Sequence, residues 1–264
     1  MRDGSISIVD THAHLCDAAF DIDRPEVLSR ARSAGVSSIV ACSENLDDAR
    51  KNLELATLFP MLKPAAGLYP TFLDYDQAEE IAGFIREMHS SIYAIGEVGL
   101  DHWIIKEVHQ QEIQKEIFSF FIDLAIELDL PLNVHSRSAG RHAVDLLLKR
   151  GAKKVQLHAF DARASTALPA VEAGFLFSIP PSVVRSRQKQ KLLKQLPLAS
   201  LMAETDSPVL GPDPQKRNEP ANVTKVISAI ADIKNISSQE VLDTIFTNTC
   251  RLYGNMTPCQ KLES

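Results

Sequence analysis

Short apolar runs alternate along the chain with longer segments in which apolar residues recur every three or four positions. The short runs, rich in β-branched residues, predict buried strands, and the longer segments have the spacing of amphipathic helices. Ile6, Ile8 and Val9 mark the first strand, and further strands are predicted at 36–42, 63–67, 92–96, 131–135, 154–158, 175–179 and 199–204. Helices are predicted at 25–34, 46–58, 78–89, 110–128, 139–150, 165–173, 185–195, 222–234 and 237–252. Eight strand–helix units in 264 residues predict an α/β fold, a (β/α)8 TIM barrel rather than an open sheet.

Local signals support several of these boundaries. Gly35 and Gly174 follow predicted helices, at the position where glycine commonly ends a helix. The stretch Ser237-Ser238-Gln239-Glu240 has the pattern of a capping box, which predicts the start of the last helix. Neither a low-complexity stretch nor a block of charge divides the chain, so residues 1–264 are predicted to form a single domain.

Residues that bind metal ions recur at the carboxyl ends of the predicted strands. In a (β/α)8 barrel these ends form one face, which carries the chemistry. Two histidines follow the first strand with one residue between them, and residues i and i+2 of an extended chain point the same way. Imidazole and carboxylate ligands together suit zinc, manganese, iron or nickel. The residues at these positions are His12, His14, Glu97, His135, His158 and Asp206.

Six such residues are more than one tetrahedral ion with an open position requires. Two ions that share a carboxylate would use all six, and Glu97 is the predicted bridge. Each residue also has an ordinary alternative. A histidine at a strand end often packs through hydrogen bonds, Glu97 can pair with an arginine, and Asp206 before Ser207-Pro208 can form a turn. The combination at one face, rather than any single residue, predicts the metal site.

Composition and charge exclude several classes of protein. Apolar residues are 45% of the chain and charged residues 23%, as in globular proteins, and no apolar run has the length of a membrane span or signal peptide. The net charge of −6 argues against a protein that coats nucleic acid through a broad positive surface, so a polynucleotide substrate would meet a local site.

No Cys-x-x-Cys pair occurs, which predicts reduced thiols in a cytoplasmic or, in a eukaryote, nuclear protein. We expect a monomer or weak oligomer. The four cysteines are Cys16, Cys42, Cys250 and Cys259.

Several stretches resemble the motifs of the TatD family of metal-dependent hydrolases, which belongs to the amidohydrolase-like (β/α)8 barrels. They occur in family order and extend over nearly the whole chain, and the motifs around Glu97 and Asp206 are quite specific together. Residues 136–141 and 179–198 look most similar to the third of the vertebrate TatD-domain paralogues. The matching stretches are Asp10-Thr11-His12-Ala13-His14-Leu15, Ile95-Gly96-Glu97-Val98-Gly99-Leu100-Asp101, Asn133-Val134-His135-Ser136-Arg137, Leu157-His158-Ala159-Phe160, Glu204-Thr205-Asp206-Ser207-Pro208 and Asn218-Glu219-Pro220.

This resemblance implies a divalent-metal-dependent deoxyribonuclease, often a 3′–5′ exonuclease that acts on single-stranded ends of DNA. One stretch departs from the family pattern: Gly67-Leu68-Tyr69-Pro70 stands where the family usually has Gly-x-His-Pro, with that histidine near the substrate phosphate. A phenol can donate a hydrogen bond to a phosphate but carries no positive charge at neutral pH. The resemblance implies two divalent ions (Zn, Mn, Mg, Ni or Fe) as cofactors, and it assigns their ligands to His12, His14, Glu97, His135, His158 and Asp206.

The expected mechanism follows from these ligands. Two ions about 3.5–4 Å apart bind a phosphate oxygen and activate a water for in-line attack. Asp206 is predicted to accept the proton of that water, with Glu97 as the bridging ligand beside it. Arg137 is expected to bind the phosphate, and a surface ion pair is the equally supported alternative. Asp101 and Glu204 are expected to orient a histidine or a loop.

Other functions stay open from the residues alone. The first is hydrolysis of an amide, a lactone or a small phosphoester on the same barrel. Many such relatives bridge their metals with a carbamylated lysine after strand four, where this chain has Glu97. The second is a non-catalytic scaffold, which has no physical need for six ligand positions. The basic run at 185–191 can guide a nucleic-acid strand, although a solvated helix face is the more common role for such a run.

Overall fold

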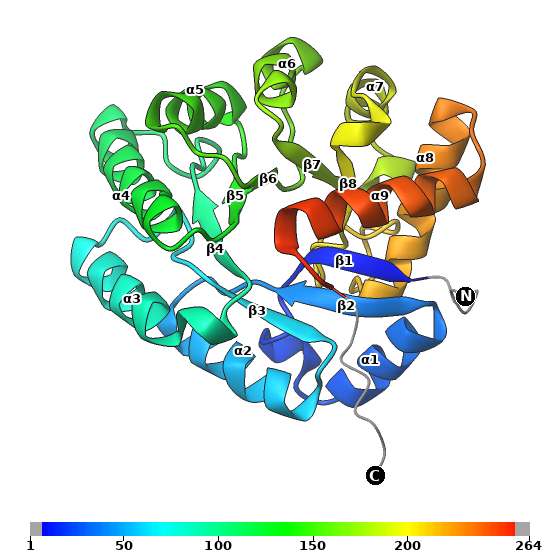
Figure 1. Ribbon diagram of the computed structural model, residues 1–264, viewed down its shortest axis with the longest axis horizontal. Helices are drawn as coiled ribbons and strands as arrows, with labels where there is room; N and C mark the ends of the chain where they lie inside the picture. The colour runs from blue at the N-terminus through cyan, green and yellow to red at the C-terminus, as the bar shows by residue number, and fades with distance from the viewer. Residues whose placement is uncertain (1–6, 257–264) are drawn as a thin grey trace.

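Residues 7–256 are described by a computed structural model, in which eight parallel strands form a barrel inside a ring of helices (Figure 1). Each strand pairs with the next one in the chain, so the predicted fold class is confirmed. The prediction of one domain over residues 1–264 stays a prediction, because Ile6 and Cys259 are among the residues outside the described range. The strands are β1 (Ile8–Ala13), β2 (Val36–Ala41), β3 (Leu62–Ala66), β4 (Ala94–Gly99), β5 (Leu132–His135), β6 (Val155–Leu157), β7 (Leu176–Ile179) and β8 (Leu201–Ala203).

The barrel closes at a seam between β1 and the segment that follows β8. Ala13 forms a parallel bridge with Ser207. The backbone N–H of Asp206 donates to the carbonyl of His12, and the N–H of His14 donates to the carbonyl of Ser207, both at 2.8 Å. The seam therefore lies at the carboxyl ends of the strands, beside the two histidines of β1.

Helices α1 to α8 cover the outside of the barrel, and α9 lies across β1 and β8 (Figure 1). Gly35 and Gly174 have φ angles of 90° and 85°, as expected for residues that end helices. The hydroxyl of Ser237 accepts a hydrogen bond from the N–H of Glu240 at 3.1 Å, as a capping box requires. The helices are α1 (Arg24–Ser33), α2 (Leu46–Leu58), α3 (Tyr75–Met88), α4 (Val108–Glu127), α5 (Gly140–Arg150), α6 (Ala164–Glu172), α7 (Arg187–Gln195), α8 (Val223–Lys234) and α9 (Ser238–Tyr253).

Two strands extend beyond the apolar runs that predicted them. β1 continues to Ala13 and β4 continues to Gly99, so His12 and Glu97 lie inside strands rather than just after them. The apolar pattern missed these ends because polar residues occupy them and bond within the barrel instead of to water. α3 begins earlier than predicted, at Tyr75, and α7 begins later, at Arg187.

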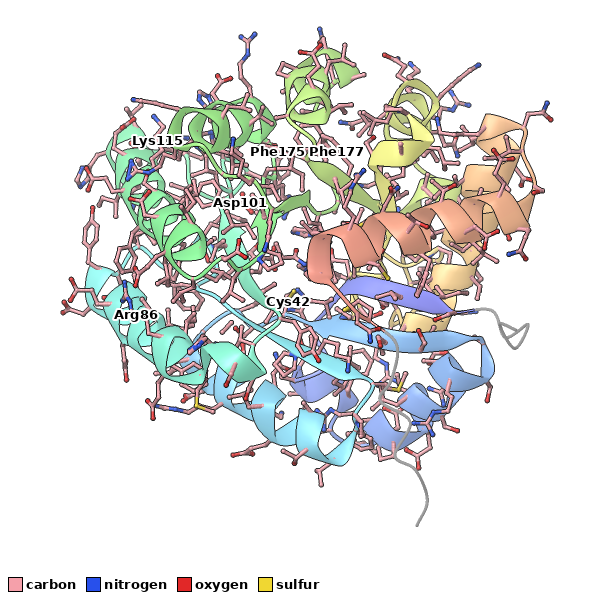
Figure 2. The ribbon with its side chains drawn as sticks, in the orientation of Figure 1. Cys42, Arg86, Asp101, Lys115, Phe175 and Phe177 are labelled. Carbon is pink, nitrogen blue, oxygen red and sulfur yellow. The ribbon has the colours of Figure 1, made fainter. Side chains whose placement is uncertain are left out.

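Apolar side chains fill two layers. The larger layer lies between the strands and the surrounding helices and includes Phe175 and Phe177. Figure 2 labels these two residues beside β7, inside the circle of helices, whereas Arg86 and Lys115 lie on the outer helices. The smaller layer joins side chains of the strands to the end of α9. Its buried members are Val9, Val40, Cys42, Ala65, Ala94, Leu176, Met202, Leu252, Tyr253 and Met256.

Helix α9 also reaches the polar interior of the barrel. The hydroxyl of Tyr253 donates to Gln156 Oε1 at 2.5 Å and accepts from Asn133 Nδ2 at 3.1 Å. These bonds satisfy polar groups that would otherwise be buried without partners. With one end of the barrel packed by α9, the open space lies at the carboxyl ends of the strands. Over the described residues, no helix combines the length and apolar character that crossing a membrane requires.

Candidate metal centre

Four histidines and two carboxylates meet at the carboxyl ends of the strands. All six side chains are buried, although none belongs to the apolar pattern that predicted the barrel. The structure therefore brings together every residue that the sequence nominated as a metal ligand. They are His12 and His14 from β1 and the residue after it, Glu97 from β4, His135 from the end of β5, His158 after β6, and Asp206 after β8.

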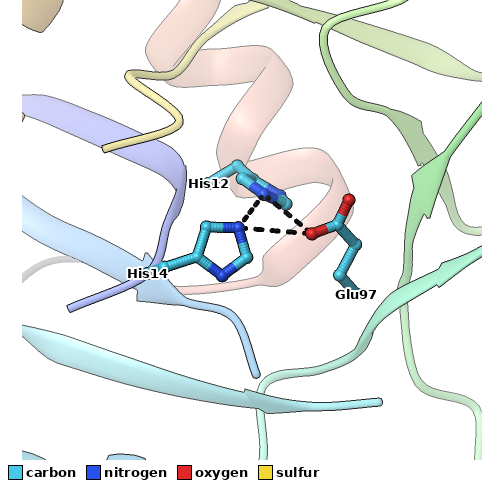
Figure 3. A group of neighbouring side chains, drawn as sticks. All are labelled: His12, His14 and Glu97. Atoms are coloured by element: carbon cyan, nitrogen blue, oxygen red, sulfur yellow. Dashed lines mark hydrogen bonds and ion pairs between the residues drawn. The ribbon is translucent and has the colours of Figure 1, made fainter. Parts of the chain in front are cut away.

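The carboxylate of Glu97 faces two groups of histidines, one with each oxygen. Its Oε2 lies 3.5 Å from His12 Nε2 and 3.2 Å from His14 Nε2 (Figure 3). Its Oε1 lies 2.6 Å from His135 Nδ1 and 2.7 Å from His158 Nε2. Glu97 forms a compact group of potential ligands with each pair. A carboxylate that bridges two metal ions must lie between two sets of ligands, and Glu97 has this position.

Asp206 completes the group on the Oε2 side. Its Oδ1 lies 3.4 Å from His12 Nε2 and 3.6 Å from His14 Nε2. We refer to His12, His14 and Asp206 as the first half of the centre, and to His135 and His158 as the second half. Glu97 lies between the two halves and contacts both.

The backbone at Asp206 is held in an unfavourable conformation. Its φ of 57° is uncommon for a residue with a side chain and persists only where surrounding bonds enforce it. The carboxylate of Asp10 supplies such bonds, because it accepts from the N–H of Thr205 at 2.8 Å and from the Thr205 hydroxyl at 2.5 Å. The bond from Asp206 N–H to His12 adds a third. These bonds connect the two motifs physically, since Asp10 of the first motif orders the segment of the second.

Two glycines allow β4 to carry Glu97 close to β5. A Cβ atom on Gly96 would lie 2.6 Å from the Cβ of Asn133. A Cβ atom on Gly99, which has a φ of 145°, would lie 2.0 Å from the carbonyl oxygen of His135. Neither separation is sterically possible, so both positions require glycine. The glycines on either side of Glu97 thus serve the approach of the two strands.

Asn133 orients His12. Its Oδ1 lies 2.8 Å from His12 Nδ1, and its amide nitrogen donates to the carbonyl of Thr11 and to Tyr253. Because the amide nitrogen is engaged elsewhere, the oxygen accepts from the Nδ1–H of His12, which leaves Nε2 free to bind a metal. Sequence reasoning did not assign this role to Asn133. A signal existed, since Asn133 precedes His135 by two residues and shares its face of β5.

Asp101 orients His135 from the other side, as predicted. Its Oδ2 lies 3.1 Å from His135 Nε2. Its Oδ1 accepts from the backbone N–H groups of Trp103 and Ile104, each at 2.8 Å. The carboxylate therefore fixes both the histidine and the loop after β4, and Nδ1 is the nitrogen that His135 presents to Glu97.

Glu204 lies behind His158. Its Oε1 is 3.9 Å from His158 Nδ1 and accepts from the N–H of Ala159 at 2.9 Å, so it fixes the loop after β6. Burial raises the pKa of Glu204 to about 8. With His12 and His158, Glu204 forms a further group of potential ligands, and Nδ1 of His158 lacks a hydrogen-bond partner among the described residues.

The histidines and carboxylates shift one another's pKa values. Burial by itself lowers the pKa of His135, but the carboxylates of Glu97 and Asp101 together outweigh burial and raise it to about 9. Burial and the neighbouring His12 lower the pKa of His158 to about 4. Burial by itself raises the pKa values of Glu97 and Asp206, but the histidines hold both below their usual range. Both carboxylates are therefore ionised at neutral pH, which is the form that binds a cation.

A cavity of about 430 Å³ opens from this centre. Tyr69 borders it, with its ring edge-on to His135 at 5.1 Å between centroids. Burial raises the pKa of the Tyr69 phenol, so it is a neutral hydrogen-bond donor. Arg137 also borders the cavity and stacks on Trp103, with its Cζ 5.1 Å from the ring centroid. Arg137 forms no ion pair with any described residue, and its role at the phosphate stays a prediction.

Two further residues of the cavity wall were not identified from the sequence. Lys189 borders the cavity and donates from Nζ to the carbonyl of Ala159 at 2.8 Å, and burial lowers its pKa. The more common role given to the basic run, a solvated helix face, is therefore wrong for Lys189. The direction of the Lys189 side chain was not predictable from the sequence, because it depends on the residue at which α7 begins. Glu44 also borders the cavity, and its position just after β2 was a usable signal.

The model of the family described as TatD related DNase matches residues 9–254. The chain belongs to this TatD family. The human protein named deoxyribonuclease TATDN3 is 42% identical over 97% of this chain and 98% of its own length. YabD of Bacillus subtilis, named an uncharacterized metal-dependent hydrolase, is 33% identical over 93% of this chain and 98% of YabD. The crystal structure of YJJV, a TatD homologue from Escherichia coli, has a TM-score of 0.87 and 25% identity, and covers 94% of this chain and 98% of that one.

These relationships confirm two predictions. The resemblance to the TatD family is confirmed, and the similarity to the third vertebrate paralogue agrees with the match to human TATDN3. The TatD chain is accordingly a metal-dependent hydrolase that acts on ester bonds, on an amidohydrolase-like barrel. Membership of this family of hydrolases argues against the alternative of a non-catalytic scaffold.

Proposed function

We propose that the chain hydrolyses phosphodiester bonds of DNA, as a 3′–5′ exodeoxyribonuclease, with two divalent metal ions bound at the centre. The observation that carries this proposal is the position of Glu97, which directs one carboxylate oxygen to each half. The substrate class follows the name of the human relative, deoxyribonuclease TATDN3. The direction of cleavage follows the family resemblance of the motifs.

The side chains fit divalent ions well. The first half and Glu97 Oε2 offer two imidazoles and two carboxylates, and the second half and Glu97 Oε1 offer two imidazoles and one carboxylate oxygen. Such mixed sets suit zinc, manganese, iron or nickel, and magnesium where carboxylates dominate. When bound, the ions supply Lewis-acid stabilisation of phosphate charge and lower the pKa of water.

The residues of this chain supply the remaining functions. Asp206 is ionised and borders the cavity, so we assign it as the base that accepts the proton of the attacking water. Arg137 contributes a permanent positive charge and a planar donor pair that suits a phosphate. The Tyr69 hydroxyl donates a neutral hydrogen bond from the same wall. Lys189 adds a second basic side chain, whose Nζ is held by a hydrogen bond to the carbonyl of Ala159.

The experiment that tests this proposal uses metal-loaded protein and single-stranded oligonucleotides labelled at either end. A 3′–5′ exonuclease shortens a 5′-labelled strand stepwise and releases a labelled mononucleotide from a 3′-labelled strand. Glu97→Gln, which removes one oxygen and the charge, should abolish both products. Release of mononucleotides from the 5′ end would contradict the direction. Cleavage of bis(p-nitrophenyl) phosphate with no cleavage of any oligonucleotide would favour the small-phosphoester alternative.

A cytoplasmic location and a monomeric or weakly oligomeric state belong to the same proposal. Cys16, Cys42 and Cys250 are free thiols, which is the form that a reducing compartment maintains. Light scattering after size-exclusion chromatography tests the oligomeric state. A tight dimer at micromolar concentration would contradict it.

A further inference from the structure

Two hollows extend the cavity across the rim formed by α5, α6, α7 and the loops after β5 and β6. The nearer hollow, of about 630 Å³, shares Arg137 and Asp161 with the cavity. The outer hollow, of about 460 Å³, shares Arg163 and Gln188 with the nearer one. The cavity and the two hollows therefore adjoin one another in a row that leads away from the metal centre. We refer to it as the arginine trough, defined by Trp103, Arg137, Arg141, Asp161, Arg163, Gln188 and Lys191.

The arginine trough is cationic in a chain with a net charge of −6. Four of the side chains in its walls are Arg or Lys. The one carboxylate in the walls is that of Asp161. The oxygens of Asp161 already accept from the N–H of Ser138 at 3.2 and 3.0 Å. A local excess of positive charge on an acidic protein attracts a polyanion at that place and not over the whole surface.

The cations of the trough have no partners within the described part of the protein. The side chains of Arg141, Arg163 and Lys191 form neither an ion pair nor a hydrogen bond with any described residue, and Arg137 only stacks on Trp103. Grouped like charges repel one another in the folded state, so their grouping is explained by an anionic ligand better than by stability.

The arginines on the opposite side of the barrel mouth are paired. Arg30 pairs with Glu219 and Arg217 pairs with Asp23, each at 2.6 Å. Both pairs tie the loop after β8 to the region around α1. Paired arginines thus lie beside the seam, whereas the cations beside α5 to α7 have no ion-pair partner among the described residues.

Trp103 gives the trough a second kind of binding surface. This residue is the one tryptophan of the chain, and 56% of it is exposed. The guanidinium of Arg137 stacks on its ring, and Lys106 Nζ lies 5.2 Å from the ring centroid. Indole rings and guanidinium planes are the groups on which unpaired nucleobases stack. An acidic peptide would satisfy the charge of the trough, but runs of Asp and Glu carry no aromatic ring to stack on this surface.

We infer that the arginine trough binds the part of a single-stranded nucleic acid that flanks the phosphodiester held in the cavity. Arg141, Arg163 and Lys191 bind successive phosphates along the strand, and Trp103 stacks against a base. The inference rests on the proposed function and deepens it, because the trough makes a polynucleotide, not a small phosphoester, the preferred substrate. Arg137 joins the two regions, since it borders both the cavity and the trough.

The test compares Arg141→Ala/Arg163→Ala with Arg32→Ala/Lys153→Ala, in the full-length, metal-loaded protein. Both double variants remove two positive charges from exposed side chains without ion pairs to described residues, and Arg32 and Lys153 lie at the opposite end of the barrel. KM is measured for single-stranded oligonucleotides, for a dinucleotide and for bis(p-nitrophenyl) phosphate. Thermal unfolding shows that each variant is folded.

We expect the trough variant to raise the ratio of KM for the oligonucleotide to KM for the chromogenic diester by about tenfold, the effect of losing at least one charged hydrogen bond. The dependence of log Kd on log salt should become shallower by about 0.7 for each phosphate that the variant no longer binds. Trp103→Ala should also weaken oligonucleotide binding, and Trp103→Phe should restore part of it. The control variant should match the wild type in every measurement.

Equal ratios in the trough variant and the control would overturn the inference. If the wild-type chain cleaves no oligonucleotide, the proposed function has failed. The arginine trough is then tested by oligonucleotide binding alone, so the two failures can be told apart. Anisotropy of a fluorescein-labelled oligonucleotide serves for this measurement. No binding to the wild type, equal binding to the trough variant, or tighter binding of poly-aspartate than of the oligonucleotide would each contradict a nucleic-acid site.

Discussion

The two halves of the metal centre are held in place by different parts of the fold. His12 and Asp206 of the first half lie at the seam, where the backbone bond between them also closes the barrel. The second half lies on neighbouring strands in the middle of the sheet, and the side chain of Asp101 orients His135 there. The first half therefore depends on closure of the barrel, whereas the second half depends on single side chains that can be changed one at a time.

The polar partners on the two sides reflect this difference. For the first half, Asp10 orders the backbone around Thr205 at the seam, and Asn133 of β5 sets the tautomer of His12. On the other side, Asp101 and Glu204 bond to loops as well as facing a histidine. We therefore expect changes beside the second half to affect folding less than changes at the seam. Four predictions test this comparison, ordered from the largest expected effect to the smallest.

Replacing Glu97 should affect both halves at once. In Glu97→Ala, the ligand shared between them is removed, so the chain should bind at most one ion tightly. The loss of activity should exceed the factor of about 10²–10⁴ that removal of a base alone produces. Elemental analysis of purified protein gives the ion count, and Glu97→Gln controls for side-chain volume. Two tightly bound ions in Glu97→Ala would show that Glu97 is not the bridge.

Replacing Asp206 should affect the chemistry of the first half. Asp206→Asn keeps the shape and one metal-binding oxygen but removes the negative charge, so the attacking water loses its proton acceptor. We expect a folded variant that still holds at least one ion, with turnover lower by about 10²–10⁴. Turnover is measured at saturating metal, so that weaker binding is not mistaken for lost chemistry. Near-normal turnover under these conditions would place the base elsewhere, with His102 and Glu204 as the next residues to test.

Replacing Asp101 should weaken the second half alone. Asp101→Asn leaves an oxygen for the loop N–H groups but removes the charge beside His135, and loss of such a partner typically lowers metal affinity or activity by about 10–100-fold. The matched change at the seam is Asp10→Asn, which removes a buried carboxylate that accepts two hydrogen bonds from Thr205 and a longer one from the N–H of His12.

Isothermal titration with metal and thermal unfolding should separate the two variants. Asp10→Asn should lower the unfolding temperature more than Asp101→Asn does, because a poorly satisfied group at the seam costs about 1–3 kcal/mol. Equal losses of stability in the two variants would show that the halves are not held differently.

Replacing Tyr69 should have the smallest effect, because it borders the cavity without joining either half. Tyr69→Phe removes one neutral hydrogen bond to the phosphate, a loss of about 0.5–1.5 kcal/mol in substrate affinity. Tyr69→His introduces a group that can carry a charge or a proton and should change turnover on phosphodiesters several-fold. Steady-state constants that match the wild type in both variants would show that Tyr69 only packs against His135.

The sequence by itself determined the class of fold and nominated the residues that the structure brings together at the candidate metal centre. Alternating apolar runs and helical segments indicate a (β/α)8 barrel, and in that fold all strand ends share one face. Residues as distant in the chain as His12 and Asp206 could therefore be assigned to one site before any distance was known. Asp101 was predictable for a related reason, since it follows β4 closely and its loop remains near the end of that strand.

Only the tertiary structure decided how these residues face one another. The separate directions of the two Glu97 oxygens and the φ of Asp206 depend on closure of the barrel, which no local pattern encodes. The direction of Lys189 depends on the residue at which α7 begins, because each step along a helix rotates the side chain by about 100°. The arginine trough also depends on the tertiary structure. Its side chains come from different loops and helices, and their lack of partners among the described residues becomes visible only when every neighbour is in place.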